Sequence, residues 1–171
     1  HLATHTSGLP RLPTNMKPAD PKNPYADYTH ERLYEFLDGY RPRRAPGRRS
    51  EYSNLAVGLL GDILARKAGK SYEVLAQERL LKPLGMNDTS IALSKSQRER
   101  LAPPFAAGGE PESNWDIPGL AGAGAVRSTA DDMLKFIAAQ IEPPEGALDE
   151  AIDLAWQEHQ KPVAGNPFAM G

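Results

Sequence analysis

The chain has 171 residues, 40% hydrophobic and 25% charged, with a formal net charge of −2, which is typical of a globular domain with one hydrophobic core. The weakly negative charge argues against a general nucleic-acid binder, which needs a basic excess or patch. No apolar run approaches the roughly 20 residues of a transmembrane segment, and the absence of Cys excludes disulfides, thiolate catalysis and Cys-based zinc sites.

The N-terminal part of the sequence predicts a loop, a helix and a basic link. Residues 1–28 show no helical or strand period that lasts more than a few residues. Thr29 is a candidate N-cap for a helix that Gly39 and Pro42 bring to an end. The link over residues 41–49 is rich in arginine, and we interpret it as a solvated loop because it lacks interleaved aromatic residues and a docking helix.

The most informative stretch is residues 51–54, Glu-Tyr-Ser-Asn, with the apolar helix that follows it. Ser53 or Asn54 is the candidate N-cap of this helix, and Gly69 is a typical C-terminal stop. In an extended or turn backbone the side chains of Tyr52 and Asn54 leave on the same side. Because a phenol can transfer a proton and a carboxamide can hold a carbonyl group, this pair is the candidate site.

Two further helices are predicted from cap and stop signals in the middle of the chain. Ser71 begins a helix that Pro83 ends. Ser94 with Gln97 three residues later is a capping-box pattern for a short helix that reaches about Leu101.

The last two predicted helices follow a loop. Ser128 or Thr129 caps a helix with an apolar face. Residues 148–156 have apolar positions at helical spacing, closed by Pro162. The apolar face of the earlier helix carries Met133, Leu134, Ile137 and Ile141.

Residues 102–124 form the long irregular loop, which is rich in Pro and Gly. Within it, Gly122-Ala123-Gly124 permits a close approach of two backbones. The sequence therefore predicts a mainly α fold with two long loops, at most one or two short strands, and no internal repeat. Loops of this length usually cover a surface or form one wall of a site.

Several blocks, taken in order, resemble the signatures of one enzyme family. The blocks are residues 2–10 (LATHTSGLP), Pro46-Gly47 with Tyr-Ser-Asn at 52–54, residues 69–72 (GKSY) with 83–89 (PLGMNDT), and 122–124 with 128–133 (STADDM). Over about residues 2–140 they resemble the class C β-lactamase-like serine hydrolases. That family includes β-lactamases, DD-peptidases, D-aminopeptidases and esterases.

The resemblance implies a two-part fold, in which a helical part is inserted into an α/β part, with the active site between them. Residues 1–171 correspond to the helical domain alone. The implied reaction is acyl transfer through a serine in a Ser-x-x-Lys motif. Tyr52 would act as general base or acid, and Asn54 would hold the amide carbonyl of the substrate. A Lys-Thr-Gly or His-x-Gly strand would supply further donors.

The sequence lacks the other motifs of this machinery. No serine is followed three residues later by Lys, and no Lys-Thr-Gly, His-x-Gly or His-Glu-x-x-His is present. With a start at His1 and no initiator Met, we interpret the chain as a fragment that is inactive alone. Its expected partners are the missing α/β part and a β-lactam, D-Ala peptide or ester substrate. No metal or cofactor is expected. The resemblance suggests a bacterial periplasmic or secreted location.

Two weaker site candidates and one alternative function complete the sequence-based hypotheses. Arg49, with Arg48, precedes Tyr52 and could attract a substrate carboxylate. Trp115 could reach the cleft from the long loop. The alternative function is a non-catalytic protein-interaction module derived from the same family. In either case we expect the face that meets the α/β part to be apolar and to promote self-association when exposed.

Overall fold

Helices make up nearly all the regular structure in residues 1–159 and 161, the part of the chain that the computed structural model describes. They are α1 (His30–Gly39), α2 (Asn54–Ala68), α3 (Tyr72–Ala76), α4 (Lys95–Glu99), α5 (Ala130–Ile141) and α6 (Ala147–Trp156), with a π-helical turn η1 (Gln77–Leu81) after α3 and a 3-10 turn η2 (Ala121–Ala123). Extended pairing over the same residues amounts to two isolated bridges, Ser90 with Arg127 and Phe105 with Pro111. The predicted mainly α class is confirmed.

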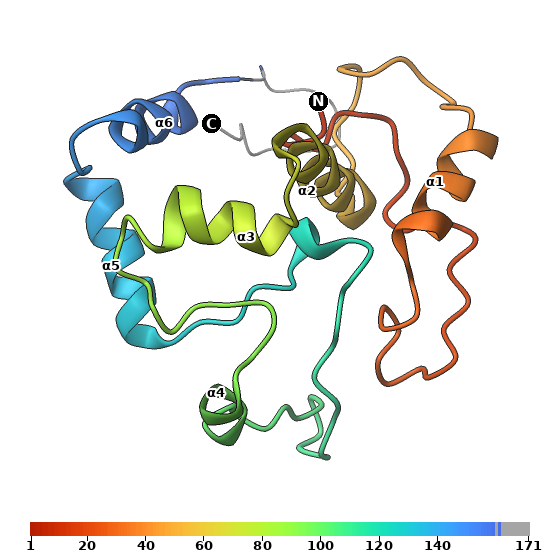
Figure 1. Cartoon of the computed structure of the whole chain (residues 1–171). Helices are drawn as coiled ribbons and strands as arrows, with labels where there is room; N and C mark the ends of the chain where they lie inside the picture. The colour runs from red at the N-terminus through yellow and green to blue at the C-terminus, as the bar shows by residue number, and fades with distance from the viewer. Residues whose placement is uncertain (160, 162–171) are drawn as a thin grey trace.

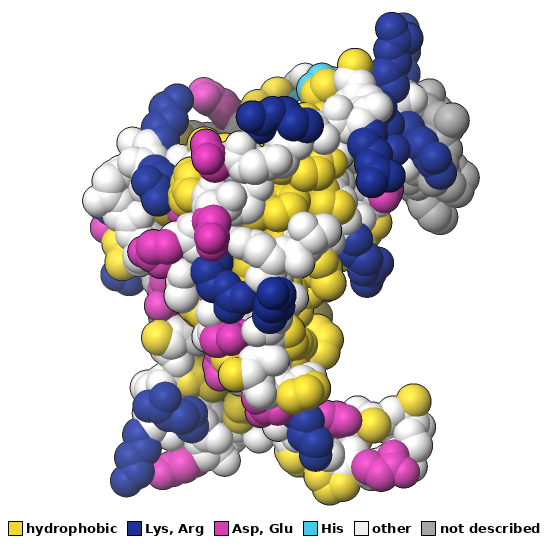
Figure 2. Space-filling view, turned by 90° about the vertical axis from the view of Figure 1, so that its right-hand side faces the viewer, with side chains coloured by type: hydrophobic (Ala, Val, Ile, Leu, Met, Phe, Trp, Pro, Cys, Tyr) yellow, Lys and Arg dark blue, Asp and Glu magenta, His cyan; other side chains and the backbone are white. Residues whose placement is uncertain are grey.

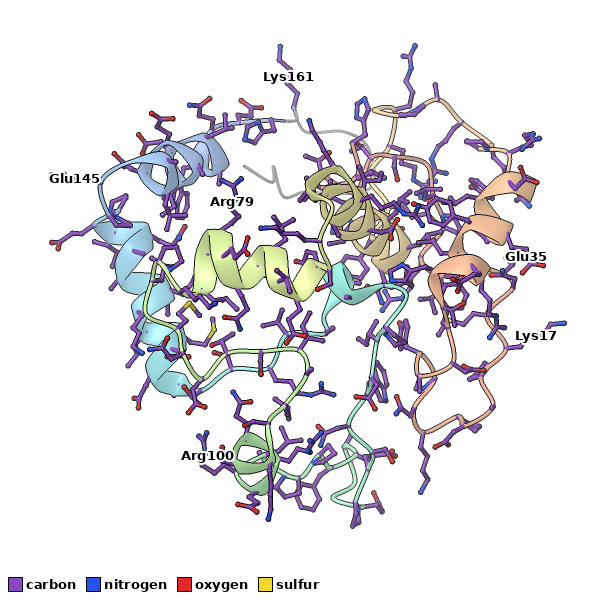
Figure 3. All side chains as sticks on the ribbon, viewed as in Figure 1. Lys17, Glu35, Arg79, Arg100, Glu145 and Lys161 are labelled. Carbon is purple, nitrogen blue, oxygen red and sulfur yellow. The ribbon has the colours of Figure 1, made fainter. Side chains whose placement is uncertain are left out.

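The helix α2 lies at the centre of the arrangement. Helix α1 lies on one side of it, while α3 and η1 run from its C-terminal end toward α5 and α6 on the other side (Figure 1). Helix α4 lies at one end of the molecule. Figure 3 shows Arg100, the C-cap residue of this helix, and Lys161 at opposite ends of the view.

Local capping explains where the helices begin. Of the two starts that the sequence left ambiguous, α2 is capped by Ser53 rather than Asn54, and α5 by Thr129 rather than Ser128. The N-caps whose side chains accept a backbone N–H are Thr29, Ser53, Ser71, Ser94 and Thr129. Gly69 ends α2 in the left-handed region, with φ of 64°, as the stop signal predicts. Helix α4 has the predicted capping box but ends at Glu99, short of Leu101. Helix α6 ends at Trp156, and the predicted stop at Pro162 lies outside the described residues.

The hydrophobic core joins the N-terminal loop to the first two helices. Residues 1–28 form no helix or strand, as predicted, yet this loop supplies three core residues. The buried cluster consists of Leu9, Tyr25 and Tyr28 from the loop, Leu33 and Phe36 from α1, Leu55 and Ala56 from α2, and Leu120. The start of α2, which carries the candidate site, therefore rests on the most buried part of the molecule.

Helix α2 and the turn η2 approach each other closely enough to require glycine. A Cβ added to Gly61 would lie 2.9 Å from the Cα of Gly122, and a Cβ added to Gly122 would lie 2.8 Å from the carbonyl oxygen of Val57. Both distances are shorter than a carbon side chain tolerates. The close-approach interpretation of residues 122–124 is confirmed at Gly122.

Two of the sequence blocks meet at a buried carboxylate. Asp132, in α5, is 2% exposed. One carboxylate oxygen accepts the backbone N–H of Asp88 at 2.8 Å and the hydroxyl of Thr89 at 2.8 Å. The other oxygen lies 2.7 Å from the ammonium of Lys135. Asp132 therefore holds the 83–89 turn against α5.

The apolar face of α5 is exposed, because no described segment covers it. Its four side chains are between 43% and 75% exposed: Met133, Leu134, Ile137 and Ile141. Leu154 and Trp156 of α6 are exposed as well. The face seen in Figure 2, on the α1 side, carries both signs of charge around an apolar band. Over the described residues, no helix is both long and apolar enough to span a membrane.

Candidate active site

Tyr52 and Asn54 flank the N-cap of α2; Tyr52 is exposed and Asn54 is half-buried. Ser53 between them is fully buried. Its hydroxyl donates to the carbonyl of Pro10 at 2.7 Å and accepts the N–H of Ala56 at 2.9 Å. Because neighbouring side chains in extended backbone alternate, burial of Ser53 directs Tyr52 outward, whereas Asn54 begins the helix and is half-buried. The Ser53 hydroxyl is occupied by these two bonds, so it is not available as a nucleophile.

The segment over residues 5–11 runs alongside the candidate site and fixes its backbone. Glu51 N–H donates to the carbonyl of His5 at 2.8 Å, and Ser53 N–H donates to Nδ1 of His5 at 3.2 Å. Leu55 N–H donates to the carbonyl of Arg11 at 3.3 Å. Burial lowers the pKa of His5 and so favours the neutral imidazole, and the bond from Ser53 N–H assigns Nδ1 as its unprotonated nitrogen. The 2–10 block thus supports the Tyr-Ser-Asn block.

The ring of Tyr52 contacts an imidazole and a guanidinium. The ring centroids of Tyr52 and His5 are 4.7 Å apart, and the guanidinium carbon of Arg11 is 5.1 Å from the Tyr52 centroid. The side chain of Tyr52 remains 54% exposed. Its hydroxyl has no hydrogen-bond partner among the described residues, so it can exchange a proton with an incoming group.

Asn54 connects the site to the two long loops. Its amide nitrogen donates to the hydroxyl of Tyr25 at 3.0 Å. The Tyr25 ring lies 5.6 Å, centroid to centroid, from the ring of Trp115. The loop that carries Trp115 is held by Asp116, whose N–H donates to the side-chain oxygen of Asn23 at 2.8 Å. Tyr25 therefore contacts both Asn54, through its hydroxyl, and Trp115, through its ring.

Arg49 is not brought to the pair. It is exposed, and no contact joins it to Tyr52 or Asn54 in the described structure. The cation at Tyr52 is instead Arg11, while Glu51 pairs with Arg44. Sequence reasoning missed both Arg11 and Tyr25. Arg11 directly follows the recognisable 2–10 block, which is a usable signal, whereas nothing local distinguishes Tyr25.

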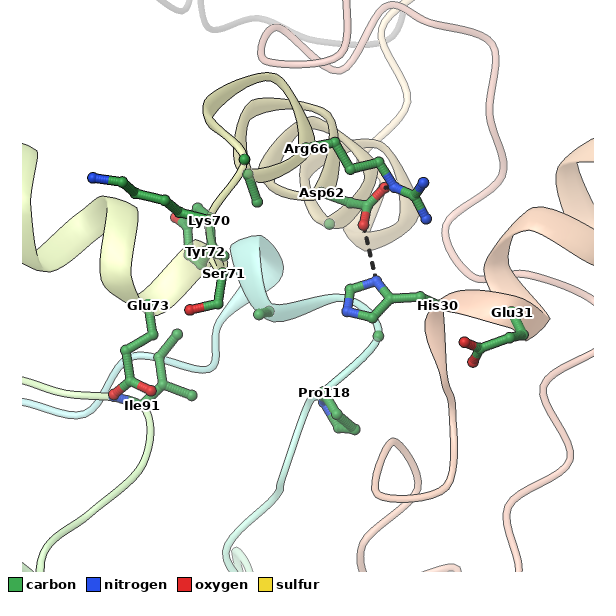
Figure 4. Close-up of a pocket in the computed structure, with 15 residues that line it drawn as sticks. His30, Glu31, Asp62, Arg66, Lys70, Ser71, Tyr72, Glu73, Ile91 and Pro118 are labelled. Carbon is green, nitrogen blue, oxygen red and sulfur yellow. Dashed lines mark hydrogen bonds and ion pairs between the residues drawn. The ribbon is translucent and has the colours of Figure 1, made fainter.

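A separate cavity of about 610 Å³ opens between α2, the start of α3 and the segment that precedes η2 (Figure 4). Its lining includes His30 and Asp62, whose nearest N and O atoms are 2.9 Å apart. Arg66 also pairs with Asp62, at 3.1 Å, and the hydroxyl of Tyr34 donates to the same carboxylate. This hydrogen bond and burial raise the pKa of Tyr34.

The charges around this cavity are mostly satisfied within the fold. Lys70 pairs with Glu78, and the carboxylate of Glu73 accepts the N–H groups of Ile91 and Ala92 at 2.8 Å each. The hydroxyl of Ser71 caps α3. The groups that line the cavity belong to the junction of α1, α2 and α3. Within the described residues, no group of three or more His, Cys, Asp or Glu side chains could hold a metal ion.

Comparisons with known proteins find relatives that are named beta-lactamase or D-alanine carboxypeptidase. A family model described as Beta-lactamase matches residues 1–168. The D-alanyl-D-alanine-carboxypeptidase/endopeptidase AmpH of Escherichia coli is 37% identical over 137 residues, which cover 80% of this chain and 34% of that protein. A beta-lactamase of Escherichia coli is 30% identical over 92% of this chain and 41% of its own length. The crystal structure of a beta-lactamase/D-alanine carboxypeptidase from Pseudomonas syringae superposes with a TM-score of 0.73 at 26% identity, over 89% of this chain and 41% of that one. The chain thus spans less than half the length of these relatives.

Proposed function

Because the chain belongs to the beta-lactamase family, we propose that the protein containing it is a serine hydrolase that cleaves an amide, β-lactam or ester bond through an acyl-serine. Residues 1–171 are its helical domain and supply Tyr52 and Asn54 to a site shared with an α/β part. The relatives named beta-lactamase and carboxypeptidase support hydrolase chemistry.

The observation that carries the proposal is the free hydroxyl of Tyr52 on a rigid support. The backbone on both sides of Tyr52 is held by hydrogen bonds to residues 5–11, and its ring contacts His5 and Arg11. A catalytic group must be held in place while its reactive atom remains accessible. Tyr52 meets both conditions.

The proposed roles follow from the chemistry of the two side chains. The Tyr52 side chain, reacting as the phenolate, takes the proton of the attacking serine hydroxyl as the Ser–acyl bond forms and becomes the neutral phenol. It then passes a proton to the departing nitrogen or oxygen as the substrate bond breaks. Asn54 has a second amide N–H beyond the one given to Tyr25, and this N–H holds the carbonyl of the acyl group.

The test uses the full-length protein that contains this chain, with fluorescent penicillin labelling read by mass spectrometry and ester hydrolysis as a second readout. Tyr52→Phe should lower the acylation rate by about 100-fold or more without changing the unfolding midpoint, since the hydroxyl it removes bonds to nothing described. Tyr72→Phe, which alters the cavity of Figure 4, is the matched control and should leave the rate unchanged. Equal rates for Tyr52→Phe and the wild type would contradict the assigned role.

A non-catalytic interaction module is the second candidate, and the exposed apolar face of α5 favours it. A helix face of this kind is usually covered by another protein surface. If the full-length protein is neither labelled by penicillin nor active on esters, this function replaces the first. In that case, Ile137→Lys should abolish partner binding, while Tyr52→Phe should not.

A further inference from the structure

We propose that Arg11 is a specificity-determining residue, whose guanidinium binds a carboxylate carried by the acyl part of the substrate. The inference rests on the proposed function and adds a substrate class to it: acyl groups with a negative charge at their far end.

The backbone of Arg11 is fixed relative to the candidate site. Its carbonyl accepts the N–H of Leu55 at 3.3 Å, directly after Asn54. The carbonyl of the preceding residue, Pro10, accepts the hydroxyl of Ser53 at 2.7 Å. These two bonds join the start of the Arg11 side chain to the segment that carries Tyr52. Arg11 is therefore a fixed neighbour of the site.

The guanidinium of Arg11 keeps its hydrogen-bond donors free. It lies over the ring of Tyr52, with its carbon 5.1 Å from the ring centroid. A ring face attracts the cation without using its N–H groups. Over residues 1–159 and 161, Arg11 pairs with no carboxylate. Other arginines do form such pairs: Arg32, Arg44, Arg66, Arg100 and Arg127.

The groups around Tyr52 leave Arg11 as the positive charge that an incoming anion meets. His5, on the same ring, is buried, and burial lowers its pKa, so it is neutral near pH 7. Glu51, the residue before Tyr52, is neutralised by Arg44. A planar guanidinium with free donors binds a carboxylate through two parallel hydrogen bonds.

The other side of the site suits the carbon chain of such an acyl group. Asn54, which is proposed to hold the acyl carbonyl, is backed by Tyr25 and Trp115. Trp115 is half-exposed and offers an apolar ring surface. An acyl chain can rest on the exposed ring of Trp115, which packs against the buried Tyr25, and its terminal carboxylate can extend toward Arg11.

The experiment compares two esters on the full-length protein: mono-p-nitrophenyl adipate, which is anionic, and p-nitrophenyl hexanoate, which is neutral and of equal chain length. Arg11→Met should lower kcat/KM for the adipate ester about ten- to a hundredfold, mainly through KM, and change the hexanoate value less than about twofold. Arg11→Lys should fall between, because a lysine keeps the charge but loses the bidentate geometry. Arg49→Met is the matched control and should not alter the ratio of the two values.

Three results would overturn the inference. An equal loss on both esters would make Arg11 a support for Tyr52 only, and a changed ratio in Arg49→Met would move the specificity to the basic link. In both cases the proposed hydrolase function would stand. If the wild type hydrolyses neither ester, acyl groups of this class are not its substrates and the inference fails; if penicillin does not label it either, the proposed function fails as well.

Discussion

Asp132 carries a buried negative charge that holds α5 against the 83–89 turn, so its replacement should weaken the fold in a pH-dependent way. Asp132→Ala removes the acceptor for Asp88 N–H and the Thr89 hydroxyl, which lie 2.8 Å away. Hydrogen bonds to a charged acceptor contribute about 1.5–3 kcal/mol each and are not additive. We therefore expect the free energy of unfolding to fall by about 3–5 kcal/mol.

Asp132→Asn keeps the shape and one acceptor oxygen but removes the charge. We expect it to cost about 1–3 kcal/mol at pH 7. Lys135→Met is the matched control. Its ammonium is half-exposed, so its loss should cost about 1 kcal/mol or less despite the 2.7 Å contact with Asp132. Urea unfolding followed by circular dichroism at 222 nm measures all three variants.

The pH dependence of stability distinguishes the contribution of the Asp132 charge from that of its shape. Burial acts to raise the pKa of Asp132, but hydrogen bonds from Lys135, Thr89 and the N–H of Asp88 outweigh it, and the pKa lies below its ordinary value of 3.8. A carboxylate with a lowered folded-state pKa stabilises the fold above 3.8 and loses this contribution as pH falls through the folded-state pKa. The difference between wild type and Asp132→Asn should therefore shrink below pH 3.8. A difference that stays constant from neutral pH to pH 3 would show that the charge is not responsible.

Three other changes have defined outcomes. Gly61→Ala should destabilise the fold by about 1–3 kcal/mol because its Cβ would meet Gly122, whereas Gly39→Ala, with nothing within 4 Å of the added Cβ, should be near neutral by the same urea assay. The lowered pKa of His5 means that wild-type stability should decrease as pH falls below 6.5, and this decrease should be smaller in His5→Asn; equal pH profiles would show that His5 is not the titrating group. Ile137→Lys should reduce self-association of this chain in sedimentation velocity, and an unchanged distribution would exclude the α5 face as the contact.

Local sequence signals were sufficient for the helices, because a helix end is decided by a few neighbouring residues. Thr29, Ser71 and Ser94 begin helices where the cap pattern predicts, and Gly69 ends α2 in the left-handed conformation that glycine adopts most readily. A side-chain cap joins residues two or three positions apart, so its pattern is visible in the sequence. The π-helical turn Gln77–Leu81 left no such signal.

The pairing of segments distant in sequence could not be predicted in this way. Arg11 meets the Tyr52 ring across 41 positions, and Tyr34 meets Asp62 across 28. Such contacts depend on how the N-terminal loop packs into the core, which no periodicity records. For this reason the sequence suggested Arg49, the near neighbour of Tyr52, while the folded chain brings Arg11 to the ring.

The apolar face of α5 also shows which features local sequence predicts and which depend on the tertiary structure. Its 3.6-residue spacing predicts a helix with one apolar side, because the spacing depends only on the geometry of a single helix. Which surface covers that side depends on the arrangement of whole elements, and in the described structure Met133, Leu134, Ile137 and Ile141 remain exposed. Tyr52 and Asn54 were likewise recognisable as a pair, but their rigid support by His5 and Ser53 exists only once residues 5–11 pack along the start of α2.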